Sequence, residues 1–141
     1  MSFAFTLVVA TTSFAQTKSL KIGDSLPESF WTTALKTVNH PQKTIDLSED
    51  KNKLILIDFW TTWCSACLMN LPKIEALQQK FGNKVKILPV SSQDKVAMEK
   101  FFSSSNGKKF KSMMSTYEDK KLHDLFPHAG VPFIIWIKDG K

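Results

Sequence analysis

The chain of 141 residues contains two cysteines, Cys64 and Cys67, which are separated by only two residues. They follow an apolar run and precede a segment with helical periodicity, so they lie at the expected start of a helix. Free amides at a helix start would lower the pKa of Cys64 and make it a nucleophile. Cys67, one turn further in, would be more buried and would attack a mixed disulfide formed at Cys64. The spacing therefore predicts a redox-active Cys64–Cys67 pair that exchanges disulfides.

Two other uses of such a pair remain open. A structural disulfide over so short a loop removes little entropy from the unfolded chain, so it would stabilise the fold only weakly. A zinc site would require two further ligands, and His40, His123 and His128 lack ligand spacing. We interpret these histidines as surface or capping residues, and we expect neither a metal site nor a cofactor.

The cysteines must be positioned by the segments on either side of them. Residues 54–60 form an apolar run that contains Asp58, which is typical of a strand buried on both faces of a parallel sheet. The helix that follows is expected to end at Gly82. Apolar residues recur along it at helical spacing: Leu68, Leu71, Ile74, Leu77 and Phe81.

The rest of the chain predicts further strands and helices around this unit. Residues 30–38 and 43–47 would form a hairpin, and residues 85–90 and 131–137 would form two more strands. Two helices are expected between the last two strands, the first of them capped by Asp94. This order predicts an α/β fold.

The end of the sequence holds a turn without a second arm. Asp139-Gly140 would open a hairpin, but no second strand follows before Lys141. We therefore expect a domain at 30–141 that is truncated at its C-terminus, with a final hairpin strand and helix missing. Residues 16–29 are polar and would form a lead-in segment.

The N-terminus is typical of a secretory signal peptide at residues 1–15. Residues 3–10 form an apolar core too short to span a bilayer, and Ser13-Phe14-Ala15 resembles a cleavage site. No Lys or Arg precedes that core, and an N-terminal strand of the fold is the alternative. We expect an exported protein of the periplasm or cell envelope, where disulfides form. No later run reaches transmembrane length, so we expect no membrane insertion of the mature chain.

The charge pattern argues against a nucleic-acid partner. The net charge of +6 comes from 19 Lys+Arg against 13 Asp+Glu, but the lysines are scattered along the chain. Nucleic-acid binding would require them to cluster with stacking aromatic residues. We interpret them as a solvated basic surface.

The segment F-W-T-T-W-C-S-A-C at 59–67 resembles the thioredoxin-like superfamily, in particular its TlpA/ResA branch of exported thiol-disulfide oxidoreductases. Pro72 matches the proline that kinks the family's active-site helix, and Gly130-Val131-Pro132 matches the segment that carries its cis-proline. Residues 22–27 are similar to its N-terminal lead. The resemblance covers about residues 20 to 141 and implies a thioredoxin-like fold, with a central mixed sheet flanked by helices.

The resemblance also implies roles for residues near the cysteines. A cis-proline at Pro132 would turn the backbone of Val131 toward the dithiol, where it would pair with an extended substrate. An ordinary proline at a strand start is the alternative. Trp63 would present a flat apolar surface to the substrate, whereas Trp60 would lie in the core. Pro72 would bend the helix.

Asp58 is a carboxylic acid in a buried strand, where desolvation raises its pKa. In thioredoxin, an Asp at this place relays a proton to or from the buried cysteine. Much of the TlpA/ResA branch instead has Asn in the strand and Glu in the helix, whereas this chain has Asn70 in the helix. We predict that Asp58 is the general acid/base for Cys67 and that Asn70 is its polar neighbour. A hydrogen-bonded structural Asp58 is the alternative.

These features together predict a thiol-disulfide oxidoreductase that reduces disulfides of other exported proteins. The Ser65-Ala66 dipeptide favours the reducing direction, because neither residue stabilises the thiolate of Cys64. The family implies a membrane thiol donor as the partner that restores the dithiol. A thiol peroxidase of the redoxin superfamily is one alternative, since Thr61 stands three residues before Cys64. A non-catalytic truncated module is the other.

Overall fold

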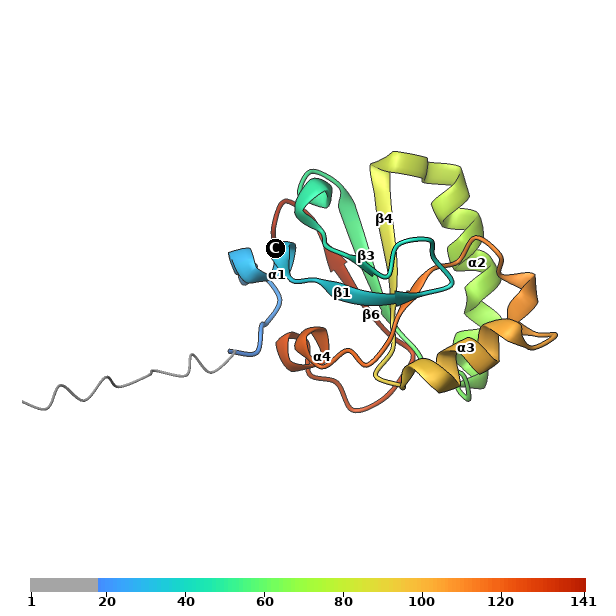
Figure 1. Ribbon diagram of the computed structural model, residues 1–141. Helices are drawn as coiled ribbons and strands as arrows, with labels where there is room; N and C mark the ends of the chain where they lie inside the picture. The colour runs from blue at the N-terminus through green and yellow to red at the C-terminus, as the bar shows by residue number, and fades with distance from the viewer. Residues whose placement is uncertain (1–17) are drawn as a thin grey trace, which may run out of the picture.

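A computed structural model of the chain describes residues 18–141 and shows two three-stranded sheets with helices around them (Figure 1). The predicted signal peptide at residues 1–15 lies outside the described residues. The mixed α/β architecture confirms the predicted fold class.

The first sheet has the strand order β4-β3-β6. Its central strand, β3, is the one that leads to the cysteines. Its strands are β3 (Leu54–Phe59), β4 (Val85–Val90) and β6 (Phe133–Ile137). β3 runs parallel to β4 but antiparallel to β6, so the sheet is mixed. The central mixed sheet that the resemblance implies is confirmed, and the parallel neighbour that the apolar run indicated is β4 alone. A strand that is buried on both faces, as β3 is, is apolar throughout whichever way its neighbours run.

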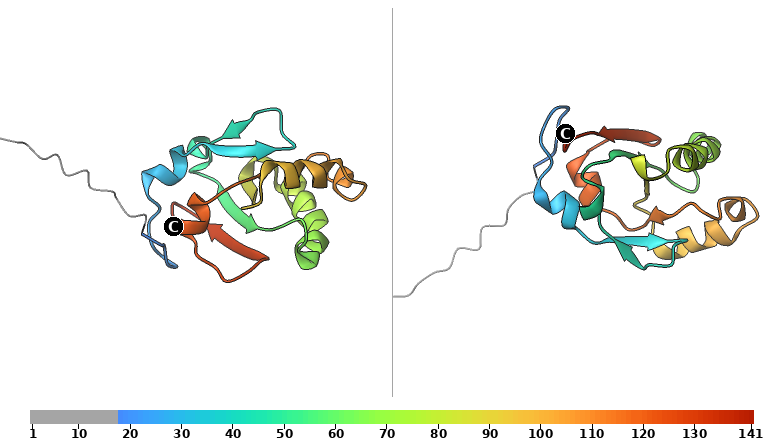
Figure 2. Two further views of the ribbon diagram at one scale, coloured as in Figure 1. Left: turned by 60° about the horizontal axis from the view of Figure 1, so that its bottom comes forward. Right: turned by 90° about the horizontal axis from the view of Figure 1, so that it is seen from above.

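The second sheet has the order β2-β1-β5 and is antiparallel throughout. It consists of β1 (Leu35–Val38), β2 (Thr44–Ile45) and β5 (Ser115–Thr116). The predicted hairpin between β1 and β2 is confirmed. Figure 2 shows this hairpin on the opposite side of the molecule from β6.

The helices connect the strands, and the longest of them follows the cysteines. Helix α2 (Ser65–Phe81) links β3 to its parallel neighbour β4, beside which it runs in Figure 1. It ends at Gly82, whose φ of 50° suits glycine. The other helices are α1 (Glu28–Thr32), α3 (Lys95–Ser103) and α4 (Lys121–Leu125), with single 3-10 turns at Ser48–Asp50, Gly82–Lys84 and Gly107–Lys109.

The first half of the predicted strand at 30–38 is a helix instead. Helix α1 extends to Thr32, and β1 begins only at Leu35. Phe30 and Trp31 are both buried in one apolar cluster, with their rings 4.9 Å apart. Adjacent residues of a strand face opposite sides of a sheet, so a strand could not bury both rings in that cluster. Tertiary packing therefore decides against the strand that the composition favours.

The buried side chains form two clusters. One lies around β3, β6, α1 and α4, and includes the fully buried Ile55, Ile57 and Phe59. The other lies around α2 and α3, and includes both cysteines together with Trp60 and Leu71. Two of the apolar residues at helical spacing in α2 are substantially exposed, Leu77 at 40% and Phe81 at 42%. The second cluster contacts only the first turns of this helix.

The C-terminal turn forms as predicted. Asp139 and Gly140 have φ angles of 52° and 75°, and Lys138 and Lys141 exchange two backbone hydrogen bonds. Positive φ at both central residues is the requirement of a type I′ hairpin turn. Strand β6 pairs with β3 on one edge, and within residues 18–141 no strand pairs with its other edge. The missing strand and helix remain a prediction.

Candidate active site

The two cysteines lie at the junction between β3 and α2 and are joined by a disulfide. Cys64 is the N-cap residue of α2, and its Sγ accepts the backbone N–H of Cys67 at 3.1 Å. Cys67 is 1% exposed and Cys64 is 7% exposed. The order of burial agrees with the prediction, and in the disulfide state only an edge of Cys64 is open to solvent.

A tight turn joins the strand to the helix. The N–H of Cys64 donates to the carbonyl of Thr61 at 3.2 Å, which makes residues 61–64 a β-turn with Thr62 and Trp63 at its centre. The turn displays the Trp63 side chain, which is 73% exposed. The contact between Trp63 and a substrate that the resemblance implies remains a prediction.

Trp60 anchors the strand side of this turn. Its backbone N–H donates to the carbonyl of Val90 at 3.0 Å. Its indole Nε1 donates to the hydroxyl of Ser115 at 2.9 Å, and the side chain is 1% exposed. The prediction that Trp60 lies in the core is confirmed.

The segment before β6 carries a cis peptide bond between Val131 and Pro132. Val131 packs against both apolar clusters, including the one that contains Cys64 and Cys67. Pro132 itself is exposed. The fold thus packs the residue before the cis-proline against the cluster that contains the disulfide, although more than sixty residues separate them in the sequence.

Asp58 lies in the middle of the first sheet, opposite Pro89 of β4 and Ile134 of β6. Its side chain is 3% exposed, and burial raises its pKa from 3.8 to about 6. Among residues 18–141 no side chain or backbone group donates a hydrogen bond to this carboxylate. The alternative of a hydrogen-bonded structural Asp58 therefore lacks a partner in the described part of the chain.

Asn70 and Pro72 lie in the first half of α2. Asn70 is half-buried and forms no hydrogen bond with Asp58, so its assignment as a polar neighbour remains a prediction. Pro72 is inside the helix, as predicted. Because proline has no N–H, the carbonyl of Leu68 lacks its helical donor.

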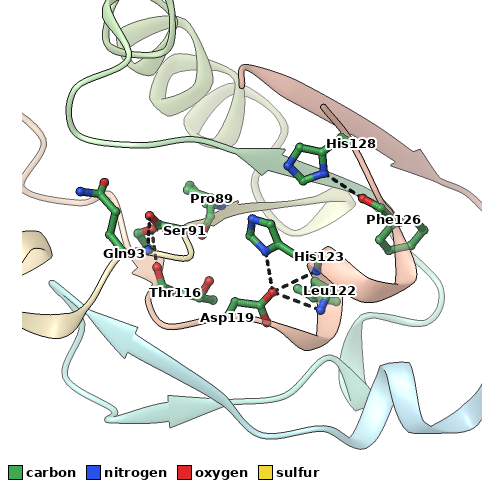
Figure 3. A network of polar contacts seen from close by, with 10 residues as sticks. Pro89, Ser91, Gln93, Thr116, Asp119, Leu122, His123, Phe126 and His128 are labelled. Carbon is green, nitrogen blue, oxygen red and sulfur yellow. Dashed lines mark hydrogen bonds and ion pairs between the residues drawn. The ribbon is translucent and has the colours of Figure 1, made fainter. Parts of the chain in front are cut away.

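The prediction of a surface or capping residue is wrong for His123, which is half-buried, whereas the half-buried His128 contacts the carbonyl of Phe126, the C-cap residue of α4. His123 Nδ1 lies 3.0 Å from Oδ2 of Asp119, and His128 Nδ1 lies 2.8 Å from the carbonyl of Phe126 (Figure 3). Both rings pack on Phe59, at centroid distances of 4.7 and 4.4 Å.

The two imidazoles are also 5.0 Å apart, and His128 stacks on the Phe133 ring that follows the cis-proline. At the start of α4, Oδ2 of Asp119 accepts the N–H groups of Leu122 and His123. Sequence spacing did not indicate this arrangement, because it depends on how β3, α4 and β6 meet. His40 is exposed, as predicted.

Gln93 contacts the active-site turn and was not indicated by any sequence motif. Its side-chain Oε1 accepts the backbone N–H of Thr62 at 2.7 Å. Its Nε2 donates to the hydroxyl of the same residue at 3.1 Å. Thirty-one positions separate Gln93 from Thr62, so only the tertiary fold brings them together.

Comparison with known proteins agrees with this geometry. The sequence profile of the Redoxin family matches residues 21–126. The thiol-disulfide oxidoreductase ResA of Oceanobacillus iheyensis is 30% identical over 95 residues, which cover 60% of this chain and 47% of ResA. The thioredoxin-like protein YneN of Bacillus subtilis is 33% identical over 58 residues, which cover 41% of this chain and 33% of YneN. The matched part of the chain thus spans less than half of each relative.

Solved structures show the same fold. The exposed lipoprotein thioredoxin of Streptococcus pneumoniae superposes with a TM-score of 0.66 at 26% identity, covering 77% of this chain and 83% of that protein. A secreted disulfide oxidoreductase of Mycobacterium tuberculosis, homologous to DsbE of E. coli, gives a TM-score of 0.64 at 18% identity, covering 82% and 83%. At that identity the second likeness concerns the fold alone. The resemblance to ResA-type members of the thioredoxin-like superfamily is confirmed.

Every helix within residues 18–141 is too short or too polar to span a lipid bilayer.

Proposed function

Because this chain belongs to the redoxin family, we propose that it is a thiol-disulfide oxidoreductase that acts through Cys64 and Cys67. The observation that carries the proposal is the position of their disulfide. It joins the N-cap of α2 to its first turn, in the apolar cluster against which Val131, the residue before the cis-proline, packs. In a disulfide so placed, Cys64 is the less buried of the two cysteines, and the sulfur of Cys67 lies behind it to complete the exchange.

The proposed reaction transfers two electrons from the dithiol to a substrate disulfide. The Cys64 thiolate attacks one substrate sulfur, so a bond forms between them and the other substrate sulfur leaves as a thiolate. Cys67 then loses its proton and attacks Sγ of Cys64. The second substrate thiolate leaves as the Cys64–Cys67 disulfide forms. The Cys67 N–H, which points at Sγ of Cys64, stabilises negative charge on that sulfur.

Asp58 is the proposed acceptor of the Cys67 proton. Its pKa of about 6 makes it a stronger base than an ordinary aspartate, and still leaves it mostly ionised at pH 7. We expect the rate of thiol exchange to show an inflection near pH 6 that disappears in Asp58→Asn, with a loss of about tenfold at pH 7. Stopped-flow oxidation of the pre-reduced protein between pH 5 and pH 8 measures this. An unchanged pH profile in the variant would refute the relay.

The proposed substrates are disulfides of other proteins in the cell envelope. Trp63 offers an exposed aromatic face, and the backbone of Val131, two residues before β6, would pair with an extended polypeptide. Export is supported by the signal-peptide pattern and by the structural relative that is described as an exposed lipoprotein. The partner that restores the dithiol is proposed, from the family resemblance, to be a membrane thiol donor.

Reduction of insulin tests the activity. The dithiothreitol-reduced protein is expected to precipitate insulin B chain, and Cys64→Ser is expected to be inactive. Cys67→Ser is expected to accumulate a mixed disulfide with the substrate, visible on a non-reducing gel and by mass spectrometry. A wild-type protein that leaves insulin intact would overturn the proposal and favour the non-catalytic alternative.

A second candidate, thiol peroxidase, is favoured by one observation. Within the described residues, the buried hydroxyl of Thr61 has no hydrogen-bond partner, and it stands three positions before Cys64. A hydroxyl so placed could donate to a peroxide bound at Cys64. Consumption of hydrogen peroxide by the reduced protein, compared with Thr61→Val, separates this activity from disulfide reduction.

A further inference from the structure

Residues 61–64 form a turn whose two central residues make few hydrogen bonds with the rest of the described structure. Trp60 is tied to β4 on one side, and α2 begins at Ser65 on the other. Between them, Thr62 and Trp63 are the two central residues of the turn. In the part of the chain that the structure describes, the only hydrogen bonds to these two residues come from Gln93. The orientation of the turn therefore depends on one side chain from another loop.

The contact between Gln93 and Thr62 is a two-point clamp. The amide oxygen accepts the Thr62 N–H at 2.7 Å, and the amide nitrogen donates to the Thr62 hydroxyl at 3.1 Å. A single hydrogen bond would leave the residue free to rotate about it, whereas two bonds from one planar amide also fix the rotation. Thr62 is half-buried, so water competes only partly for these groups.

Gln93 is itself held by its backbone. Its N–H donates to the hydroxyl of Ser91 at 3.2 Å, and its carbonyl accepts the N–H of Glu118 at 2.8 Å. Ser91 is fully buried at the end of β4, and its carbonyl accepts the N–H of Asp119. In Figure 3, the Gln93 amide points away from Asp119 and the two histidines, while the backbone stays beside Ser91. The clamp is therefore built on a rigid base.

We propose that Gln93 is a positioning residue that holds the 61–64 turn so that Trp63 and Cys64 are presented together to a protein disulfide. This inference rests on the proposed function. A polypeptide substrate must engage the Trp63 face and the Cys64 sulfur at the same time, so a mobile turn would have to be ordered when the substrate binds. A small disulfide needs to contact only the sulfur of Cys64. Loss of the clamp therefore weakens reaction with proteins more than reaction with small disulfides.

Three substitutions separate the two contacts from the general stability of the fold. Gln93→Leu keeps a similar shape and removes both hydrogen bonds. Gln93→Glu retains both, because a carboxylate accepts the Thr62 N–H and the Thr62 hydroxyl can turn to donate. Thr62→Val removes only the hydroxyl contact. Gln79→Leu is the matched control, because Gln79 is exposed on α2 and makes no hydrogen bond within residues 18–141.

The measurement is single-turnover oxidation of the pre-reduced protein, with insulin and with Ellman's reagent as substrates. The ratio of the two second-order rate constants, insulin to Ellman's reagent, is expected to fall about tenfold in Gln93→Leu, as for the loss of one to two hydrogen bonds. It is expected to fall about threefold in Thr62→Val. The ratio is expected to return toward the wild-type value in Gln93→Glu and to stay unchanged in Gln79→Leu.

A second readout does not depend on activity. The ¹⁵N order parameters of Thr62, Trp63 and Cys64 are expected to fall in Gln93→Leu and to stay high in Gln93→Glu. An unchanged rate ratio in Gln93→Leu, or a ratio that Gln93→Glu fails to restore, would overturn the positioning role. If the wild-type protein oxidises with neither substrate, the proposed function fails, and the order parameters still decide whether Gln93 holds the turn.

Discussion

At the scale of single residues, Asp58 is where the fold and the proposed chemistry conflict. A carboxyl group in the middle strand of a sheet loses hydration, and no hydrogen bond within residues 18–141 replaces it. Burial raises the pKa of Asp58 to about 6, so the folded protein binds this proton more tightly than the unfolded chain does. The same shift that would make Asp58 a useful base thus costs stability at neutral pH.

Asp58→Asn is therefore expected to stabilise the oxidised protein at pH 7. Because the pKa of Asp58 is raised in the folded state, the protein is most stable with respect to this group below about pH 4, where Asp58 is protonated. That stability is lost as the pH rises through about 6 and the buried carboxyl ionises. A rise from 3.8 to about 6 corresponds to a difference of roughly 3 kcal/mol, at about 1.36 kcal/mol per pH unit. Urea unfolding at several pH values should show the advantage of Asp58→Asn growing between pH 4 and pH 6.

Asp124→Asn provides the control for this prediction, because Asp124 is exposed and its side chain forms no hydrogen bond in the described structure. It should leave the pH dependence unchanged. If the stability difference between Asp58→Asn and the wild type also did not change with pH, the Asp58 carboxylate would have to be solvated in the folded protein.

At the scale of elements, α2 both positions the cysteines and contains a proline. The second cluster holds the helix at Cys67, Leu68 and Leu71, all before or beside Pro72. The active-site end is thus packed firmly, while Leu77 and Phe81 near the other end are partly exposed. The proline stands where the well-packed part of the helix ends.

Pro72→Ala is expected to raise the free energy of unfolding by about 1 to 2 kcal/mol. Alanine restores an N–H for the carbonyl of Leu68 and removes the ring that clashes with it. Part of that gain is offset, because proline also restricts the unfolded chain. Guanidinium unfolding measures the change, with the exposed neighbour Lys73→Ala as a control that should shift stability by less than about 0.5 kcal/mol. A destabilised Pro72→Ala would mean that the helix must be bent to pack.

At the scale of the whole molecule, the disulfide contributes little to the stability of the fold. The loop between Cys64 and Cys67 is so short that closing it removes only about 2 kcal/mol of unfolded-state entropy. Both apolar clusters are assembled from elements distant in sequence, and neither depends on this crosslink to bring its members together. The protein can therefore pass between its dithiol and disulfide states without unfolding.

Reduction with dithiothreitol is expected to lower the free energy of unfolding by no more than about 2 kcal/mol and to leave the far-ultraviolet circular dichroism unchanged. The double variant Cys64→Ser/Cys67→Ser serves as the control, since dithiothreitol should not alter its stability. Cooperative unfolding on reduction would instead identify the disulfide as structural and would contradict its proposed role in exchange.

The sequence by itself determined the features that depend on neighbours along the chain. The apolar run of β3, the cysteines at the start of α2, the cap at Asp94 and the turn at Asp139-Gly140 were all predictable, because each reflects local backbone and solvation preferences. The cis peptide at Pro132 was predictable only through the family resemblance.

The tertiary structure decided what depends on contacts between distant segments. It made residues 28–32 a helix, because both aromatic rings there had to reach one cluster. It stacked His123 and His128 on Phe59, and it placed Gln93 against Thr62. These side chains carry no signal of their own, since a glutamine or a histidine acquires such a partner only when strands and helices pack.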